Sequence, residues 1–401
     1  MYEAAQSPVR RCALLFFGLC GVLACGDGEM SLAGQPSADT PDAPGVPDAV
    51  AAGAMGSGSG PPASAGATGT NPVQGAVDAP PVGAVTVSAA DIDAVAPAGK
   101  MRLFVGQDLD SIAAYTDTVG APGGAVGYTS LAALEGLDSL ADNGGGPNHL
   151  DALAARHPGL PLALGLYLVG DLPAINAGER DGSIARLAAV LQAHGVPVLL
   201  RVGYEFDLDW TAYEPGAYRE AFRRIAEGVR SAGATHVQLV WQSAAPCGAR
   251  YLQQPLEAWY PGDEFVDWVA VSSFAMDSCY LAEVGRVADF SEARGKPLFV
   301  AEAAPKNFDI GELTFSLDGA GREDLEAEQI WSRWFVPFLQ LLESRREVIR
   351  AVSYINADWD TQWQFGPPYT TAGYWGDSRL QANTRILELW QQQLQQDRWL
   401  R

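Results

Sequence analysis

The chain is poor in basic residues and in histidine. Its 401 residues include 26 Lys and Arg against 48 Asp and Glu, which gives a formal net charge of −22, and only four His. Binding to nucleic acid requires clustered Lys and Arg, so this balance argues against a nucleic-acid partner and against a polybasic membrane-surface protein. A neutral polysaccharide remains a suitable ligand.

Several catalytic motifs are also missing. The four histidines form neither a His-Glu-x-x-His pattern nor a close pair, which argues against a catalytic transition metal. The chain has no Gly-x-Ser-x-Gly nucleophile turn and no glycine-rich phosphate loop of the Gly-x-Gly-x-x-Gly or Gly-x-x-x-x-Gly-Lys type. The sequence therefore predicts a reaction that needs no cofactor.

The first 99 residues predict an export signal followed by a tether. Arg10 and Arg11 precede an apolar stretch that ends in Val-Leu-Ala-Cys25, which resembles the lipid-attachment site of bacterial lipoproteins; a plain signal peptide is the alternative. Residues 26–99 contain no Lys, Arg or aromatic residue and are rich in Ala, Gly, Pro and Ser, which predicts a disordered linker. We expect an exported protein, either secreted or attached to the cell envelope through a lipid on Cys25, with no other membrane contact.

Residues 100–401 alternate between short apolar runs and amphipathic stretches. Strands are expected at 102–106, 125–129, 162–168, 197–203, 237–241, 266–272, 297–301 and 350–355. Helices are expected at 183–194, 215–232, 281–294, 322–344 and 379–395. Apolar runs without alternation are typical of parallel strands buried on both faces, and eight such units in this length predict a (β/α)8 TIM barrel. An open doubly wound sheet is the competing fold.

Two of the expected strands end in a glutamate. The fourth runs into Glu205 and the seventh into Glu302. Active sites of barrels lie at the carboxyl ends of the strands, and two opposed carboxylates are the minimum equipment for glycoside hydrolysis. The alternative is that each glutamate only caps its strand or pairs with Arg201. A second alternative for the whole domain is a non-catalytic cell-surface protein that binds glycans.

The residues around these glutamates resemble a known family. Glutamates at the ends of strands four and seven are the mark of clan A glycoside hydrolases, and Arg201-Val-Gly-Tyr-Glu205 and the segment 259–269 (WYPGDEFVDWV) resemble glycoside hydrolase family 26, which includes mannanases. The resemblance implies retaining hydrolysis of a β-linked polysaccharide, with mannan as the first guess, Glu205 as acid/base and Glu302 as nucleophile. Tyr204 stands where the family has a histidine, and Phe274 where it has a tyrosine, so the sugar stays open.

Further residues near the expected strand ends are candidates for substrate binding, because aromatic rings and planar polar groups suit sugars. Besides Tyr204 and Phe274 they are Gln107, Tyr167, Arg201, Asp207, Trp210, Trp241, Gln242, Tyr354, Asn356 and Trp359. Of these, Arg201 is expected to steer the carboxylates rather than to bind the substrate.

The five cysteines predict one disulfide. Cys12 and Cys20 lie in the signal and Cys25 is the lipid site, which leaves Cys247 and Cys279 as an even pair in an oxidising compartment. Both follow neighbouring strands at similar distances, so their loops leave the same rim of the barrel. Two buried free thiols are the alternative. A monomer is expected.

Overall fold

The computed structural model describes residues 87–142, 144–248, 255–369 and 373–401. The predicted signal segment, with Cys25, and most of the predicted linker lie outside the described residues. The described ranges contain all eight strand segments expected from the sequence.

Eight parallel strands close into a barrel. They pair in the order β13-β9-β8-β7-β6-β5-β2-β1, and β13 pairs back with β1 from Arg102–Ala351 to Gly106–Ile355. The strands are β1 (Met101–Gly106), β2 (Gly124–Ser130), β5 (Leu162–Tyr167), β6 (Val198–Val202), β7 (Val237–Ser243), β8 (Trp268–Ser273), β9 (Leu298–Ala303) and β13 (Ile349–Ile355). Each end lies within two residues of the expected one, and the predicted (β/α)8 barrel is confirmed.

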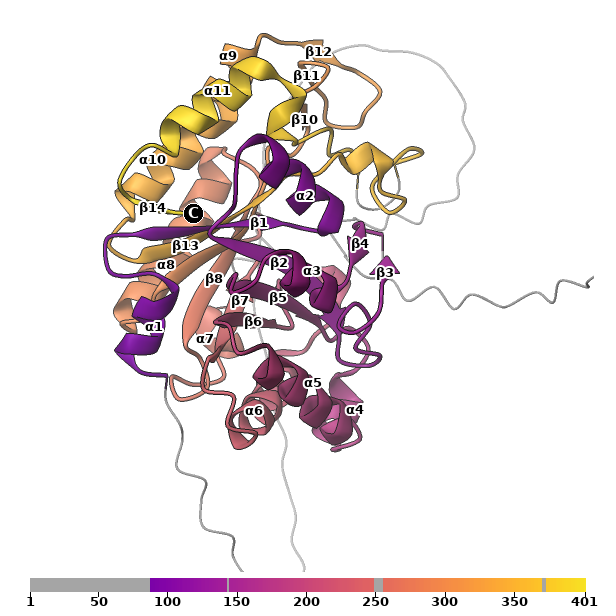
Figure 1. Ribbon diagram of the computed structural model, residues 1–401, viewed down its shortest axis with the longest axis vertical. Coiled ribbons are helices and arrows are strands. Elements are labelled where there is room, and N and C mark those ends of the chain that lie inside the picture. The colour runs from indigo at the N-terminus through magenta and orange to yellow at the C-terminus, as the bar shows by residue number, and fades with distance from the viewer. Residues whose placement is uncertain (1–86, 143, 249–254, 370–372) are drawn as a thin grey trace, which may run out of the picture. The chain divides into compact units, whose positions relative to one another are not determined.

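Helices surround the barrel, with α4, α5 and α6 on one side of the strands and α10 and α11 on the opposite side (Figure 1). They are α2 (Leu109–Thr118), α3 (Leu150–Arg156), α4 (Leu172–Asn176), α5 (Asp181–His194), α6 (Pro215–Ser231), α7 (Leu256–Trp259), α8 (Ser278–Ala293), α9 (Ala327–Ile330), α10 (Val336–Ser344) and α11 (Thr384–Gln393). A π-helical turn at Trp331–Phe335 joins α9 to α10. None of the helices among the described residues is long and apolar enough to cross a bilayer.

Two of the expected helices begin later than predicted. The helix expected from residue 322 begins at Ala327, because Glu323–Asp324 form strand β12, which pairs with β11 (Thr314–Phe315). The helix expected from residue 379 begins at Thr384, where the Asn383 side chain accepts hydrogen bonds from the first backbone amides and caps the helix.

Successive side chains along each strand point alternately into the barrel and out toward the helices, so the core has two parts. Inward-facing side chains fill the barrel, among them Phe104, Val126, Leu199, Val240, Ala270 and Phe299. The residues between them pack against the helices, among them Leu103, Leu200, Leu239, Val269 and Val300. Because both faces are buried, the strands read as continuous apolar runs in the sequence.

The amino-terminal end of the barrel is closed by helix α1 (Ala89–Val95), which lies within the predicted linker and corrects its carboxyl boundary. Val95 is fully buried among the inward-facing residues. Arg102 and Arg350 donate hydrogen bonds to the carbonyls of Val95 and Ala96. The folded domain therefore begins before residue 100. The helix is hard to predict from the sequence because it consists mostly of small and acidic residues and buries little beyond Val95.

Short strands lie in the loops at the carboxyl end of the barrel, opposite α1. Strands β3 (Ala141–Asp142) and β4 (Pro147–Asn148) lie at the end of the barrel away from α1 (Figure 1). Strand β10 (Phe308–Asp309) pairs with β11. Strand β14 (Trp399–Leu400) lies at the amino-terminal end instead, where it pairs with the start of β1 at Met101 and Arg102. The loops with β3 and β4 thus lie at the carboxyl ends of the barrel strands.

Candidate active site

Glu205 leaves the barrel wall just beyond β6. The strand ends at Val202, and both Gly203 (φ 55°) and Glu205 (φ 54°) adopt left-handed backbone conformations. A non-glycine residue rarely adopts this conformation, and where it does the surrounding structure enforces it, often at an active site. The turn leaves the Glu205 side chain at the mouth of the barrel with only 2% of its surface exposed.

Glu302 reaches the same mouth through a bulge in β9. Val271 pairs with Val300, but the next residue, Ser272, pairs with Glu302, so that β9 carries one extra residue. Strict alternation would turn Glu302 outward, since Ala301 already faces the barrel interior. The bulge redirects the carboxylate inward, which is a common use of bulges beside active sites.

Two buried donors hold the Glu302 carboxylate. Tyr128 on β2 donates its hydroxyl to Oε1 of Glu302 at 2.8 Å, and Nη1 of Arg201 on β6 donates to the same oxygen at 2.6 Å. Arg201 is fully buried, and its guanidinium also lies over the rings of Tyr128 and Tyr204, 4.9 and 5.2 Å from their centroids. The positive charge of Arg201 stabilises the ionised carboxylate in a site with little water.

Glu205 has a different environment. It accepts a hydrogen bond from the Ser272 hydroxyl at 2.7 Å. Burial raises the pKa of Glu205 well above that of an exposed glutamic acid, and the negative charge of Glu302 raises the pKa further. Ser272 and the charge of Arg201 act in the opposite direction, while the charge of Asp207 adds to the increase.

The two carboxyl groups are thus equipped for different tasks. The Arg201 guanidinium compensates the negative charge of Glu302, and Tyr128 donates to the same oxygen, so Glu302 is suited to act as the nucleophile. Burial and the charge of Glu302 favour the protonated form of Glu205, so it is suited to donate that proton to a leaving group. Such separation of two carboxyl groups by their surroundings is how acid and base roles are assigned in glycosidases.

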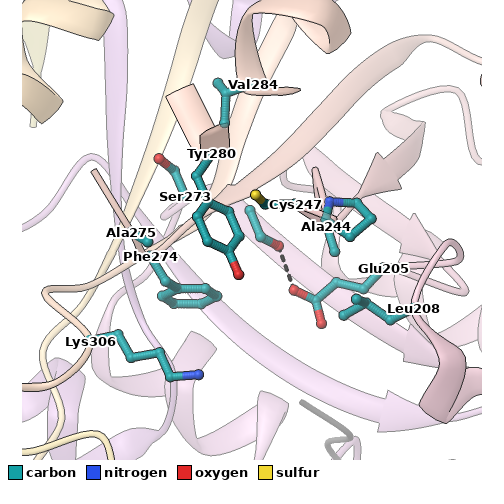
Figure 2. A pocket seen from close by; sticks show the side chains of 12 residues that line it. Glu205, Leu208, Ala244, Cys247, Ser273, Phe274, Ala275, Tyr280, Val284 and Lys306 are labelled. Atoms are coloured by element: carbon teal, nitrogen blue, oxygen red, sulfur yellow. Dashed lines mark hydrogen bonds between the residues drawn. The ribbon is translucent and has the colours of Figure 1, made fainter. Parts of the chain in front are cut away.

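A hollow opens beside Glu205. Figure 2 shows the Glu205 carboxyl, the Tyr280 hydroxyl and the Lys306 ammonium pointing into this space, with the Phe274 ring along one side. Phe274 meets the ring of Trp375 edge-on at 4.9 Å, and Lys306 lies 4.5 Å from the centroid of the same ring. The hollow therefore combines aromatic faces with polar groups, the combination that sugar sites use.

A disulfide lies in the wall of this hollow. Cys247, in the loop after β7, is bonded to Cys279 in the first turn of α8, with their Cα atoms 5.8 Å apart. The predicted pairing is confirmed. Since Cys247 lines the hollow, the bond also ties the wall beside Glu205 to α8.

Other predicted substrate-binding residues lie at the mouth of the barrel. Tyr167 stacks on Trp210 with 6.1 Å between ring centroids, and Tyr204 lies edge-on to Tyr128. Gln107 donates to the side chain of Gln362. Asp207 accepts hydrogen bonds from the Ser243 hydroxyl and the Ala244 amide, so it joins the loops after β6 and β7.

Four predicted substrate-binding residues do not face the mouth. Trp241 and Tyr354 pack in the outer core, because their neighbours Gln242 and Ser353 occupy the inward positions of β7 and β13. Asn356 is fully buried and uses its amide to bind the Leu380 backbone and the Gln381 side chain. Trp359 is 1% exposed and lies beneath Phe365 and Trp375, so it supports the rim instead of offering a platform.

Five further groups at the site are not among the residues predicted from the sequence: Tyr128, Ser272, Tyr280, Lys306 and Trp375. Tyr128 and Ser272 could have been found by alternation, because each occupies an inward position near the carboxyl end of its strand. Tyr280, Lys306 and Trp375 lie in α8 and in loops, where the sequence carries no comparable signal.

A second hollow at the same end lies between the loops after β1, β2 and β13. Its lining includes Asp108, Asp142, Asp358 and Trp363, the last of which is 58% exposed. Burial raises the pKa of Asp108 to about 6. Within the described ranges no group of three or more His, Cys, Asp or Glu is arranged to hold a metal ion.

Two curated proteins resemble the chain over most of its length. It is 36% identical over 302 residues to a β-1,3-xylanase of Vibrio sp., a match that covers 74% of the chain and 65% of the relative. It is 34% identical over 325 residues to a β-1,3-xylanase of Alcaligenes sp., which covers 80% of the chain and 69% of the relative. The chain thus spans about two thirds of the length of these relatives. No family model matches it.

Solved structures share the fold at much lower identity. An endo-β-1,4-mannanase of Cellulomonas fimi superposes with a TM-score of 0.53 at 16% identity, covering 79% of this chain and 76% of the other. A family 26 β-mannanase of Bacteroides ovatus gives a TM-score of 0.51 at 14% identity, covering 78% and 95%. At this level of identity, the structural similarity shows only that the fold is shared.

Proposed function

Because the chain belongs to glycoside hydrolase family 26, we propose that it hydrolyses a β-linked polysaccharide with retention of configuration at the anomeric carbon. The observation that carries this proposal is the pair Glu205 and Glu302 in opposite electrostatic environments at one barrel mouth. The alternative of two strand caps does not account for the bulge that turns Glu302 inward.

In the first step Glu302 attacks the anomeric carbon while Glu205 gives its proton to the departing glycosidic oxygen. The bond between the anomeric carbon and that oxygen breaks, and a glycosyl ester on Glu302 forms. In the second step Glu205, now ionised, takes a proton from water, whose oxygen attacks the same carbon and releases Glu302. Retention requires about 5–5.5 Å between the two carboxyl groups, so we expect that separation here.

We propose β-1,3-linked xylan as the substrate, in place of the mannan suggested by the sequence. Support comes from the two β-1,3-xylanases at 34–36% identity, against 14–16% for the mannanases. The two residues that depart from the mannanase pattern both lie at the site, since Tyr204 packs against Arg201 and Phe274 lines the hollow beside Glu205.

Product analysis tests both parts of the proposal. Purified protein should release reducing sugar from β-1,3-xylan faster than from β-1,4-mannan, β-1,4-xylan or mixed-linkage β-glucan. Proton NMR during the first minutes should show the β-anomer of the new reducing end. An α-anomer would indicate inversion, and activity highest on mannan would contradict the proposed substrate.

Variants of the two glutamates test the mechanism. Glu302→Gln should lower kcat by more than about 10⁴-fold while substrate binding is kept, because the nucleophile is lost. Glu205→Ala should lower activity on polysaccharide by about 10²–10⁴-fold but spare aryl glycosides, whose leaving group needs no proton. Glycan binding without turnover in the wild-type protein would favour a non-catalytic glycan-binding role.

We also propose that the protein is exported, monomeric and held at the cell envelope through a lipid on Cys25, which lies outside the described residues. Metabolic labelling with a radioactive fatty acid should mark the wild-type protein and not Cys25→Ala. Label on the variant would exclude Cys25 as the attachment site.

A further inference from the structure

We propose that Gln242 and Ser272 form a hydrogen-bond relay that fixes which oxygen of Glu205 carries the catalytic proton and couples Glu205 to the charge of Glu302. The inference rests on the proposed function. It changes the role of Gln242 from a substrate contact to a positioning residue, and it gives Ser272 a role.

The relay has one possible direction. Nη1 of Arg201 lies 3.2 Å from Oε1 of Gln242, and a guanidinium can only donate, so Gln242 presents its oxygen to Arg201. The Gln242 amino group therefore points the other way and donates to the Ser272 hydroxyl oxygen at 3.0 Å. Ser272 has a single proton, and its oxygen already accepts, so that proton goes to Oε1 of Glu205 at 2.7 Å.

This direction assigns the two oxygens of Glu205. Oε1 accepts from Ser272 in both steps of the reaction, so the transferable proton resides on Oε2. The relay residues are buried, with Gln242 at 0% and Ser272 at 4% exposure, so Glu205 receives this hydrogen bond from the protein. The acid in the first step and the base in the second are then the same atom.

The other end of the relay is the nucleophile. The same Nη1 of Arg201 that binds Gln242 donates to Oε1 of Glu302, which also accepts from Tyr128. The attack on the sugar is therefore assigned to Oε2 of Glu302. When that oxygen becomes part of the ester, Glu302 loses its charge. The positive charge of Arg201 then polarises Gln242 and, through it, Ser272. Ser272 becomes a stronger donor to Glu205 at the step in which Glu205 acts as a negatively charged base.

The sign of the pH effect follows from the groups around Glu205. Glu302 on β9 and Asp207 in the adjoining loop disfavour its ionised form, whereas Arg201 and Ser272 favour it. Lys306 and Tyr280 line the same hollow. Removal of the Ser272 donor should therefore raise the pKa of Glu205, and the alkaline limb of kcat/KM, which follows loss of the Glu205 proton, should move to higher pH.

The test is the pH profile of Ser272→Ala on β-1,3-xylan or, if a different polysaccharide proves to be the substrate, on that polysaccharide. The alkaline limb of the kcat/KM profile should move to higher pH by about one unit, the size expected for a lost hydrogen bond to a charged group. The acid limb should stay in place. Ser272→Cys should shift the limb in the same direction by less, since a thiol is a weaker donor. Ser353→Ala is the matched control, because this inward-facing serine on β13 has no hydrogen-bond partner for its hydroxyl among the described residues.

An unchanged alkaline limb in both Ser272 variants, with folding verified by thermal unfolding, would overturn the relay while leaving the proposed function intact. A wild-type protein without activity on any of the polysaccharides would overturn the proposed function itself. If Ser272→Ala does not fold, Ser272→Cys alone decides, because its side chain has nearly the same shape.

Discussion

Among single residues, Arg201 is the one on which the site depends most. Its side chain is fully buried and touches Glu302, Gln242 and the faces of two tyrosine rings. A buried ion pair adds little net stability, but loss of one partner leaves the other charge uncompensated in a medium of low polarity. Arg201 therefore matters because it compensates the buried charge of Glu302.

Arg201→Met should lower the free energy of unfolding by about 3–5 kcal/mol and abolish activity. Arg201→Met combined with Glu302→Leu should be more stable than Arg201→Met alone, because no charge is then left unpaired. Arg186→Met is the control, since its ion pair with Asp138 is exposed and worth at most about 1 kcal/mol. Denaturant unfolding measures all three, and equal stability of the single and double variants would show that Glu302 does not need the charge.

The sequence could identify Glu205 and Glu302 because an acid that ends an apolar strand is conspicuous. It could not show the bulge at Ala301 or the left-handed backbone at Glu205, which decide where these carboxylates point. Trp241 and Gln242 are neighbours on β7 and so face opposite sides of the strand, which means that at most one of them can face the site. Trp241 is the one that packs outward.

At the scale of elements, the strands were the most predictable part and the helix starts the least. A buried parallel strand has a run of apolar residues with sharp ends, whereas a helix start depends on competing local pairings. Glu323–Asp324 illustrate this, since strand pairing with β11 removes them from the helix that their sequence favours. Helix α1 was missed because its contribution lies in its carbonyls, which accept from Arg102, Arg350 and Gln238.

The disulfide holds the loop after β7 to α8, and its removal should have two measurable effects. The double variant Cys247→Ser, Cys279→Ser should lose about 3–4 kcal/mol of stability, the chain-entropy value for a separation of 32 residues. It should also raise KM more than it lowers kcat, because Cys247 lines the hollow beside Glu205. Reductant should weaken the wild-type protein to the same degree and leave the double variant unchanged; a response of the double variant would point to another cause.

At the scale of the whole domain, the two ends of the barrel have different tasks. The carboxyl end holds the carboxylates and is shaped by loops, a bulge and strained backbone. The amino-terminal end is sealed by α1, whose Val95 enters the barrel, and the carbonyls of Val95 and Ala96 accept hydrogen bonds from the half-buried Arg102 and Arg350. A stable end opposite the site allows the other end to keep strained backbone and buried charge, which are costly to fold.

Two truncations separate the predicted tether from the seal. A chain of residues 87–401 should keep the thermal midpoint and activity of the full protein. A chain of residues 100–401 should lose at least about 3 kcal/mol, because Val95 no longer fills the barrel and Arg102, Arg350 and Gln238 each lose the backbone carbonyl that they bind in residues 91–96. For a domain of this size that corresponds to a fall in Tm of roughly 5 °C, measurable by scanning calorimetry. The same Tm for both truncations would show that α1 adds nothing to the barrel, whereas a loss already present in 87–401 would show that the preceding segment packs on the folded domain.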